Sequence, residues 1–141
     1  MKPLYEAQAT AIGGRSGIAA TADGRLSVGF SMPKEVGGAG GDGVNPEQLF
    51  ALGYAACFLT AIKNVAGQSK IEITSDSNVT ATVGVGPREK DAEALVLTIA
   101  LAIDLPGLDR ETATSLVARA HENCPYSNAT RGNVAVKLHI A

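Results

Sequence analysis

The stretch that decides the fold is Asn45-Pro-Glu-Gln-Leu-Phe-Ala-Leu-Gly-Tyr-Ala-Ala-Cys57-Phe-Leu-Thr-Ala-Ile62. Asn45 can cap a helix, Pro46 suits its first position, and Gln48 completes an Asn-x-x-Gln capping box. The pattern predicts a helix that continues to about Ala66 and ends at Gly67. Its side chains are apolar almost all round, which is typical of a helix buried on every side.

A fully apolar helix of this length is difficult to cover in a chain of 141 residues. A chain of that size forms a single domain, here residues 1–141, and buries only about two-thirds of its extended surface. We therefore expect an obligate homodimer, with the helix that carries Cys57 near the interface.

Composition excludes several classes of function. The chain is 45% hydrophobic and 18% charged, which is typical of a globular protein. Its net charge of −2 gives no electrostatic footprint for nucleic acid. No apolar run is expected to reach the roughly 18–20 residues of a membrane span, and the N-terminus has no apolar signal core. The expected location is the cytoplasm, without nucleic-acid or membrane partners.

Alternating and helical patterns predict the remaining elements. Period-two alternation predicts strands at 5–10, 18–21, 26–31, 79–85, 95–103 and 134–140. The first three resemble a small meander, and a glycine-rich loop at 32–44 follows them. A second helix is capped by Asp109 and ends at Cys124-Pro125.

The chain has two cysteines, Cys57 and Cys124, the second within His121-Glu-Asn-Cys-Pro-Tyr-Ser-Asn128. In a reducing cytosol such a pair is catalytic, redox-active or simply buried more often than it is a permanent disulfide. Each thiol alone also fits plain core packing. A zinc site with His121 lacks the close-spaced ligand pairs that zinc prefers, because Cys57 and His139 are each isolated. A Cys–His nucleophile pair has no third orienting group.

Two charged residues could change the reactivity of these thiols. Arg15 lies in the turn Gly13-Gly-Arg-Ser-Gly17, and Glu47 lies in the first turn of the Cys57 helix. A free thiol is mostly protonated at neutral pH, and burial raises its pKa further. A guanidinium favours the thiolate, and a carboxylate can hold that guanidinium in a bidentate bridge. The Gly38–Gly43 segment matches G-x-G-x-x-G but lacks the strand and acidic residue of a dinucleotide site.

Two blocks of the chain carry a family resemblance, supported by the Arg15 turn and the glycine loop. Asn45-Pro-Glu-Gln-Leu-Phe-Ala-Leu-Gly-Tyr-Ala-Ala-Cys-Phe58 and Cys124-Pro-Tyr-Ser-Asn-Ala-Thr-Arg-Gly-Asn133 resemble the signature blocks of the organic hydroperoxide resistance (Ohr) proteins, a branch of the OsmC/Ohr family. The resemblance implies an α+β fold in which antiparallel sheets pack on a long central helix, as an intertwined homodimer.

The same resemblance implies a thiol-dependent peroxidase that reduces organic and fatty-acid hydroperoxides. Cys57 is then the peroxidatic cysteine, Cys124 resolves it, and Arg15 and Glu47 activate it. No metal, haem or flavin is implied, and the reductant is an external dithiol, a dihydrolipoyl group on a lipoylated protein. The apolar residues Met32, Phe50 and Phe58 are candidates for a substrate pocket, with plain core packing as the alternative.

Two other classes of function remain open on the residues. One is a related thiol enzyme with a different acceptor, such as a general disulfide reductase. The other is a non-catalytic dimer that binds apolar ligands through a site with inert thiols.

The spacing of Glu47 and Cys57 predicts sites shared between subunits. Ten residues of straight helix span about 15 Å along the axis, which a side chain cannot bridge. Either the helix breaks near Gly53, or the carboxylate reaches the cysteine of the other chain across a twofold axis.

Overall fold

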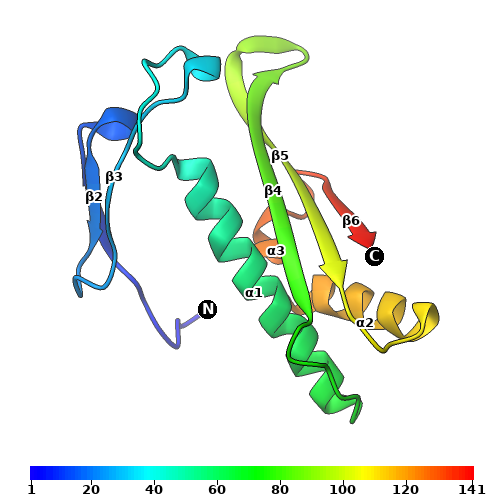
Figure 1. Ribbon diagram of the computed structural model, residues 1–141. Helices are drawn as coiled ribbons and strands as arrows, with labels where there is room; N and C mark the ends of the chain where they lie inside the picture. The colour runs from blue at the N-terminus through cyan, green and yellow to red at the C-terminus, as the bar shows by residue number, and fades with distance from the viewer. The chain divides into compact units, whose positions relative to one another are not determined.

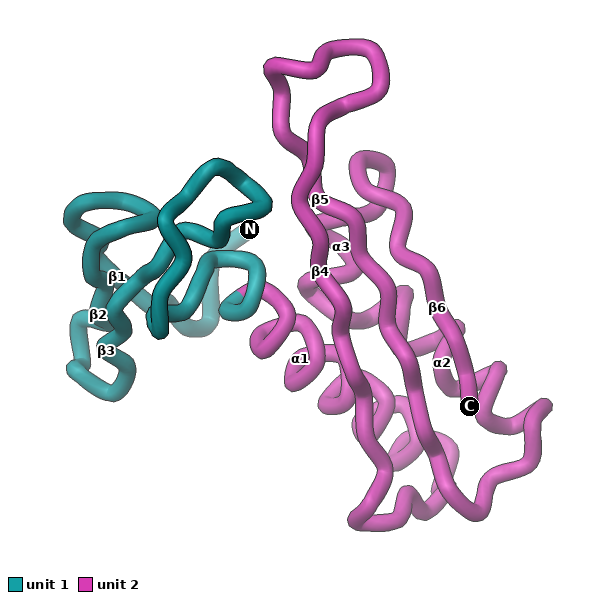
Figure 2. The backbone as a smooth tube through the Cα atoms, turned by 45° about the horizontal axis from the view of Figure 1, so that its top comes forward, with its two compact units in different colours: residues 1–49 teal, residues 50–141 magenta.

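The computed structural model describes all residues, 1–141, and divides the chain into two compact units. Unit 1 is Met1–Leu49 and unit 2 is Phe50–Ala141, shown in different colours in Figure 2. The single domain expected from the length stays a prediction.

Unit 1 is built on a three-stranded antiparallel meander (Figure 1). Its strands are β1 (Ala9–Ile12), β2 (Ile18–Thr21) and β3 (Ser27–Gly29), in the order β1-β2-β3. The expected meander is confirmed, but its first strand lies at 9–12 and not at 5–10. None of residues 1–49 is buried, so this unit has no core of its own.

A tight turn between β1 and β2 presents Arg15. The turn is a short 3-10 helix, η1 (Gly14–Ser16), which Gly13 enters with a φ of 81°. A side chain at Gly17 would place its Cβ 1.8 Å from the carbonyl oxygen of Ile12. Glycine is therefore required at both ends of the turn. A second 3-10 helix, η2 (Lys34–Val36), lies in the glycine-rich loop.

Helix α1 (Pro46–Gln68) begins with the expected capping box. The backbone N–H of Gln48 donates to Asn45 Oδ1, and the N–H of Asn45 donates to Gln48 Oε1, both at 2.9 Å. The helix continues through Gly53 and extends to Gln68, slightly beyond its expected end. A Cβ at Gly53 would lie 2.6 Å from the hydroxyl of Tyr126, so the small residue makes room for that ring.

The sheet of unit 2 has the order β4-β5-β6. Strands β4 (Asn78–Arg88) and β5 (Asp91–Asp104) form a long antiparallel hairpin. Strand β6 (Val136–Ile140) pairs with β5 in parallel, which the expected antiparallel sheets did not include. A parallel pair needs a crossover connection, and α2 (Arg110–Asn123) and α3 (Pro125–Thr130) supply it.

The helices of unit 2 lie on one face of this sheet (Figures 1 and 2). The core joins α1, β5 and α2, and includes Phe58, Leu101 and Leu116. Asp109 caps α2 by accepting from the N–H of Thr112, as expected. Helix α3 was not expected, because Pro125 ends α2 and also begins a new helix.

Within one chain, helix α1 is buried along one stripe only, and burial of its other side by a partner subunit stays a prediction. Its buried residues are Tyr54, Phe58, Ala61, Ile62, Val65 and Ala66, whereas Leu52 is 69% exposed.

By its length and a mean hydropathy of 1.5, helix α1 could cross a membrane, contrary to the expectation from apolar run length. The core helix of a soluble protein meets the same criterion.

Candidate active site

The two cysteines, 67 residues apart in sequence, meet in unit 2. Both are free thiols, and their sulfur atoms lie 3.5 Å apart. Cys57 lies in the middle of α1, and Cys124 lies at the junction between α2 and α3. A disulfide requires about 2.05 Å between the sulfurs, so they need to approach by about 1.5 Å.

The two thiols differ in their access to solvent. Cys57 is half-buried and lines a pocket of about 570 Å³, together with Ala56, Thr60, Asn64 and Pro125. Cys124 is completely buried and does not line this pocket. A small molecule that enters the pocket therefore meets Cys57 first.

The surroundings of Cys57 within unit 2 do not favour its thiolate. Burial raises the pKa of the Cys57 thiol, and the hydrogen bond and the charge of Cys124 act in the same direction. The backbone N–H of Tyr126 donates to the sulfur and opposes this rise. A cation close to the sulfur would oppose this rise, because it favours the thiolate.

Arg15 and Glu47 form the expected bidentate ion pair within unit 1. Arg15 Nη1 donates to Glu47 Oε2 at 2.8 Å, and Nη2 donates to Oε1 at 2.6 Å. The side chain of Arg15 is 35% exposed and that of Glu47 is 11% exposed. The fork geometry fixes the plane of the guanidinium and leaves its remaining N–H groups free to meet an anion.

The ion pair stabilises both charges. The hydrogen bonds from Arg15 lower the pKa of the Glu47 carboxyl, although burial opposes this. The carboxylate in turn raises the pKa of Arg15. A lowered carboxyl pKa means that the pair stabilises the fold above the usual glutamate range. This contribution is lost as the pH falls through the lowered value.

The three candidates for an apolar pocket lie in different environments. Phe58 is completely buried in the core, where its ring lies 6.3 Å from that of Tyr54, so it is a core residue and not a pocket wall. Phe50 is partly buried against the same core, with its ring 5.8 Å from that of Tyr126. Met32 is half-buried in the loop of unit 1.

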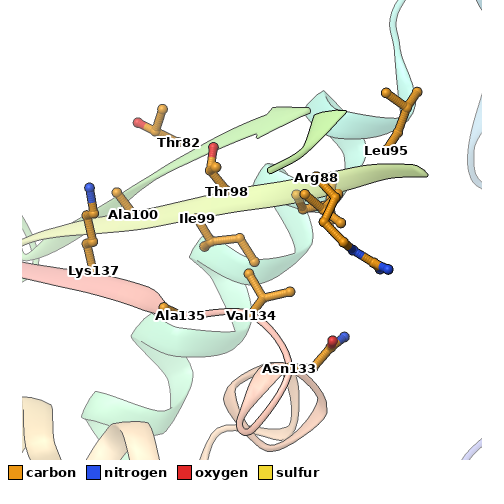
Figure 3. Close-up of a pocket in the computed structure, with 12 residues that line it drawn as sticks. Thr82, Arg88, Leu95, Thr98, Ile99, Ala100, Asn133, Val134, Ala135 and Lys137 are labelled. Carbon is orange, nitrogen blue, oxygen red and sulfur yellow. The ribbon is translucent and has the colours of Figure 1, made fainter. Parts of the chain in front are cut away.

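A second cavity in unit 2 contains no thiol. Its volume is about 740 Å³, and β4, β5 and the segment that leads into β6 line it (Figure 3). The lining is mostly apolar, with Ile99 and Val134 at its centre and Lys137 at one end. Neither Cys57 nor Cys124 lines this cavity, so the two thiols do not open onto it.

The sequence patterns did not predict a series of buried hydrogen bonds that lies close to the cysteines. Tyr54 and Ser127 are completely buried and joined by their hydroxyl groups, and Ser127 also contacts His121. From the sequence, His121 was considered only as a weak zinc ligand or as the partner of a cysteine nucleophile. Each member lies three residues from a cysteine, and this spacing is the one sequence signal that points to them.

Comparison with known proteins identifies the family of this chain. Residues 38–139 match the model of the OsmC-like proteins. The chain is 49% identical, over 99% of its length and 96% of the relative's, to the organic hydroperoxide resistance protein of Xanthomonas axonopodis pv. citri. The chain belongs to the organic hydroperoxide resistance branch of the OsmC-like family. The resemblance of the two sequence blocks is thereby confirmed.

Solved structures of this family have the same fold. The organic hydroperoxide resistance protein OhrB of Bacillus subtilis superposes with a TM-score of 0.90 at 46% identity, over 99% of this chain and 100% of that chain. A Legionella pneumophila protein described as an organic hydroperoxide resistance protein OsmC gives a TM-score of 0.91 at 48% identity, over 99% of both chains. The α+β, OsmC/Ohr-like fold is confirmed.

Proposed function

We propose that this protein is a cysteine-based peroxidase that reduces organic hydroperoxides to alcohols. The observation that carries the proposal is the pair of sulfur atoms 3.5 Å apart, of which only Cys57 opens onto a pocket. The names of the relatives, organic hydroperoxide resistance proteins, agree with such chemistry. Detoxification of organic peroxides is the corresponding role.

The proposed cycle has three balanced steps. The Cys57 thiolate attacks the distal oxygen of ROOH, the O–O bond breaks, and the released alkoxide takes a proton to leave as ROH, with a sulfenic acid on Cys57. Cys124 then attacks the sulfenic sulfur, the S–O bond breaks, and water leaves. An external dithiol finally reduces the disulfide by exchange and becomes a disulfide itself.

The roles of the four residues follow from access and charge. Cys57 meets the peroxide and is the peroxidatic cysteine, and the buried Cys124 is the resolving cysteine. The Arg15 guanidinium, held by Glu47, stabilises the Cys57 thiolate and the charge that develops on the leaving oxygen. Phe50 and Met32 are proposed to contact the alkyl part of the substrate.

The proposed reductant and location follow from the family resemblance. We propose that a dihydrolipoyl group on a lipoylated protein regenerates the thiols in the cytoplasm. The cycle needs no metal, haem or flavin, because the electrons pass between sulfur and oxygen alone.

One assay separates this proposal from its alternatives. The wild-type protein is incubated with dihydrolipoamide and either an alkyl hydroperoxide or a small disulfide. A peroxidase consumes the hydroperoxide and forms the alcohol, whereas a general reductase acts only on the disulfide. A ligand-binding protein with inert thiols consumes neither, and either of these results would contradict the proposal.

Cys124→Ser is expected to stop turnover after one step. The variant should consume one equivalent of hydroperoxide and retain a sulfenic acid on Cys57, because no second thiol lies near enough to resolve it. Reaction with a sulfenic-acid trap followed by mass spectrometry detects this species on the Cys57 peptide. Full turnover in this variant would exclude Cys124 from the cycle.

We further propose that the protein works as an intertwined homodimer with shared sites. Two observations support a partner surface: unit 1 buries no residue of its own, and Leu52 on α1 is 69% exposed. Helix α1 is unbroken at Gly53, so Glu47 and Cys57 of one chain are separated by about 15 Å along its axis. The Arg15–Glu47 pair of one chain is therefore proposed to serve Cys57 of the other.

Mixing two defective subunits tests the shared site. Cys57→Ser and Glu47→Ala chains are refolded together at equal amounts, and peroxidase activity is measured. In a shared-site heterodimer one site has both defects and the other has neither, so the mixture should regain about a quarter of wild-type activity. The two homodimers refolded separately and then pooled are the control. Equal activity of the mixed and pooled samples would mean that each site is built within one chain.

A further inference from the structure

A buried chain of hydrogen bonds joins the two helical segments that carry the cysteines. The Tyr54 hydroxyl on α1 lies 2.8 Å from Ser127 Oγ on α3. The same Ser127 oxygen lies 2.9 Å from His121 Nδ1 on α2. Tyr54 and Ser127 are completely buried, so water cannot replace either partner.

The spacing of this chain relative to the cysteines is regular. Tyr54 precedes Cys57 by three residues on α1, close to one helical turn. His121 precedes Cys124 by three residues, and Ser127 follows it by three. The backbone on both sides of Cys124 is thus tied to the helix that carries Cys57.

Few other polar contacts join α1 to the segment formed by α2 and α3. Apart from the two sulfurs and the Tyr126 N–H that faces Cys57, Arg119 donates to Gln68, at the far end of α1, and to Ser69, just beyond it. Those contacts are exposed and lie more than ten residues from Cys57. Apart from the contacts of the Cys57 sulfur itself, the Tyr54–Ser127 hydrogen bond is therefore the polar link that lies nearest to the thiols in the sequence.

The hydrogen-bond donors and acceptors of Tyr54, Ser127 and His121 can be assigned so that they match one another. Burial lowers the pKa of the His121 imidazole, and the charge of Arg131 acts in the same direction. A neutral imidazole with its proton on Nε2 accepts at Nδ1. Ser127 then donates to His121 while it accepts from Tyr54, so each hydroxyl makes the contact that its geometry allows.

We propose that Ser127, held between Tyr54 and His121, is a positioning residue that sets the rate of disulfide formation between Cys57 and Cys124. The inference rests on the proposed peroxidase function and adds to it a residue for one step, the attack of Cys124 on the Cys57 sulfenic acid. In that step an S–S bond forms, the S–O bond breaks, and hydroxide leaves as water with the thiol proton.

The attack of Cys124 on the Cys57 sulfenic acid requires the two sulfur atoms to be closely aligned. The sulfurs start 3.5 Å apart and close by about 1.5 Å, so a loosened Cys124 spends less time in line with the S–O bond. The first step, attack of Cys57 on the peroxide, does not involve Cys124. Loss of the Ser127 hydroxyl should therefore slow the second step and leave the first step unchanged.

The test compares both steps in Ser127→Ala and Tyr54→Phe. The chain has no tryptophan to report on the reaction, so samples are quenched with an alkylating agent after addition of an alkyl hydroperoxide. Mass spectrometry then counts thiol, sulfenic acid and disulfide. We expect sulfenic acid to form within twofold of the wild-type rate and the disulfide to form roughly ten- to a hundredfold more slowly.

Two controls make the result specific. Thr130→Val removes another buried hydroxyl of α3, one that donates only to the carbonyls of Tyr126 and Ser127, and should resolve at the wild-type rate. The Tyr54→Phe, Ser127→Ala double variant should be no slower than the slower single variant, because both changes break one link.

The possible outcomes separate the two proposals. If the wild-type protein forms no disulfide, the peroxidase function itself is wrong. If it does, resolution at the wild-type rate in both single variants would overturn the role of Ser127. Equal slowing of both steps, or equal slowing in Thr130→Val, would also overturn it, because loss of packing would then account for the defect.

Discussion

Cys57→Ser is expected to abolish hydroperoxide reduction completely. The serine hydroxyl has nearly the same size and suits a half-buried helical position, so the fold should persist. It cannot accept the oxygen, however, because a serine hydroxyl is not ionised at neutral pH and forms no sulfenic acid analogue. Consumption of an alkyl hydroperoxide with dihydrolipoamide should fall to the rate of the reductant alone.

Circular dichroism and thermal unfolding of Cys57→Ser control for loss of structure. Cys124→Ser is the matched variant, because it removes the neighbouring thiol and should keep one turnover. Peroxide-dependent oxidation of Cys124 in the Cys57→Ser variant would show that the two roles are reversed.

Arg15→Ala is expected to give the second largest loss of hydroperoxide reduction. Burial raises the pKa of the Cys57 thiol, and the guanidinium is the proposed cation that reverses this. A neighbouring opposite charge shifts a pKa by roughly 1–3 units, so its removal should lower the thiolate fraction at neutral pH by roughly ten- to a thousandfold. The second-order rate of Cys57 oxidation should fall accordingly.

The pH dependence gives the sign of this effect. A raised Cys57 pKa moves the rate profile to higher pH, so the defect of Arg15→Ala should shrink as the pH rises. Glu47→Ala should behave similarly but more mildly, by releasing Arg15. Arg25→Ala, which removes an exposed arginine of the same unit, is the control. An unchanged thiolate titration of Cys57 in Arg15→Ala would contradict the activation model.

The sequence predicted the parts of the fold that have local signals. The capping box of Asn45 and Gln48 marks the start of α1, and Asp109 marks the start of α2, because a helix start depends on neighbouring side chains. Helix α3 was missed because Pro125 reads as a stop signal, although the same residue favours a first helical position. The parallel pairing of β6 depends on a crossover, which no local pattern encodes.

The candidate site was only partly predictable for a related reason. Residues such as Arg15 and Glu47, 32 positions apart, have no local pattern that pairs them, and the family resemblance supplied their roles. Phe58 looked like a pocket residue because apolar side chains around a thiol can pack or bind, and only burial distinguishes the two. Ser127 was overlooked because its hydrogen-bond partners lie on two other helices, and no local sequence pattern shows which helices come together.

Disulfide mapping of the oxidised wild-type protein is the sharpest test of the proposed reaction between Cys57 and Cys124. The reduced protein is treated with one equivalent of an alkyl hydroperoxide, the remaining thiols are blocked, and the digest is analysed by mass spectrometry under non-reducing conditions. We expect release of one equivalent of alcohol and a Cys57–Cys124 bridge within one chain, with the loss of two hydrogen atoms. Intact free thiols after exposure to the peroxide, or bridges between chains only, would contradict it.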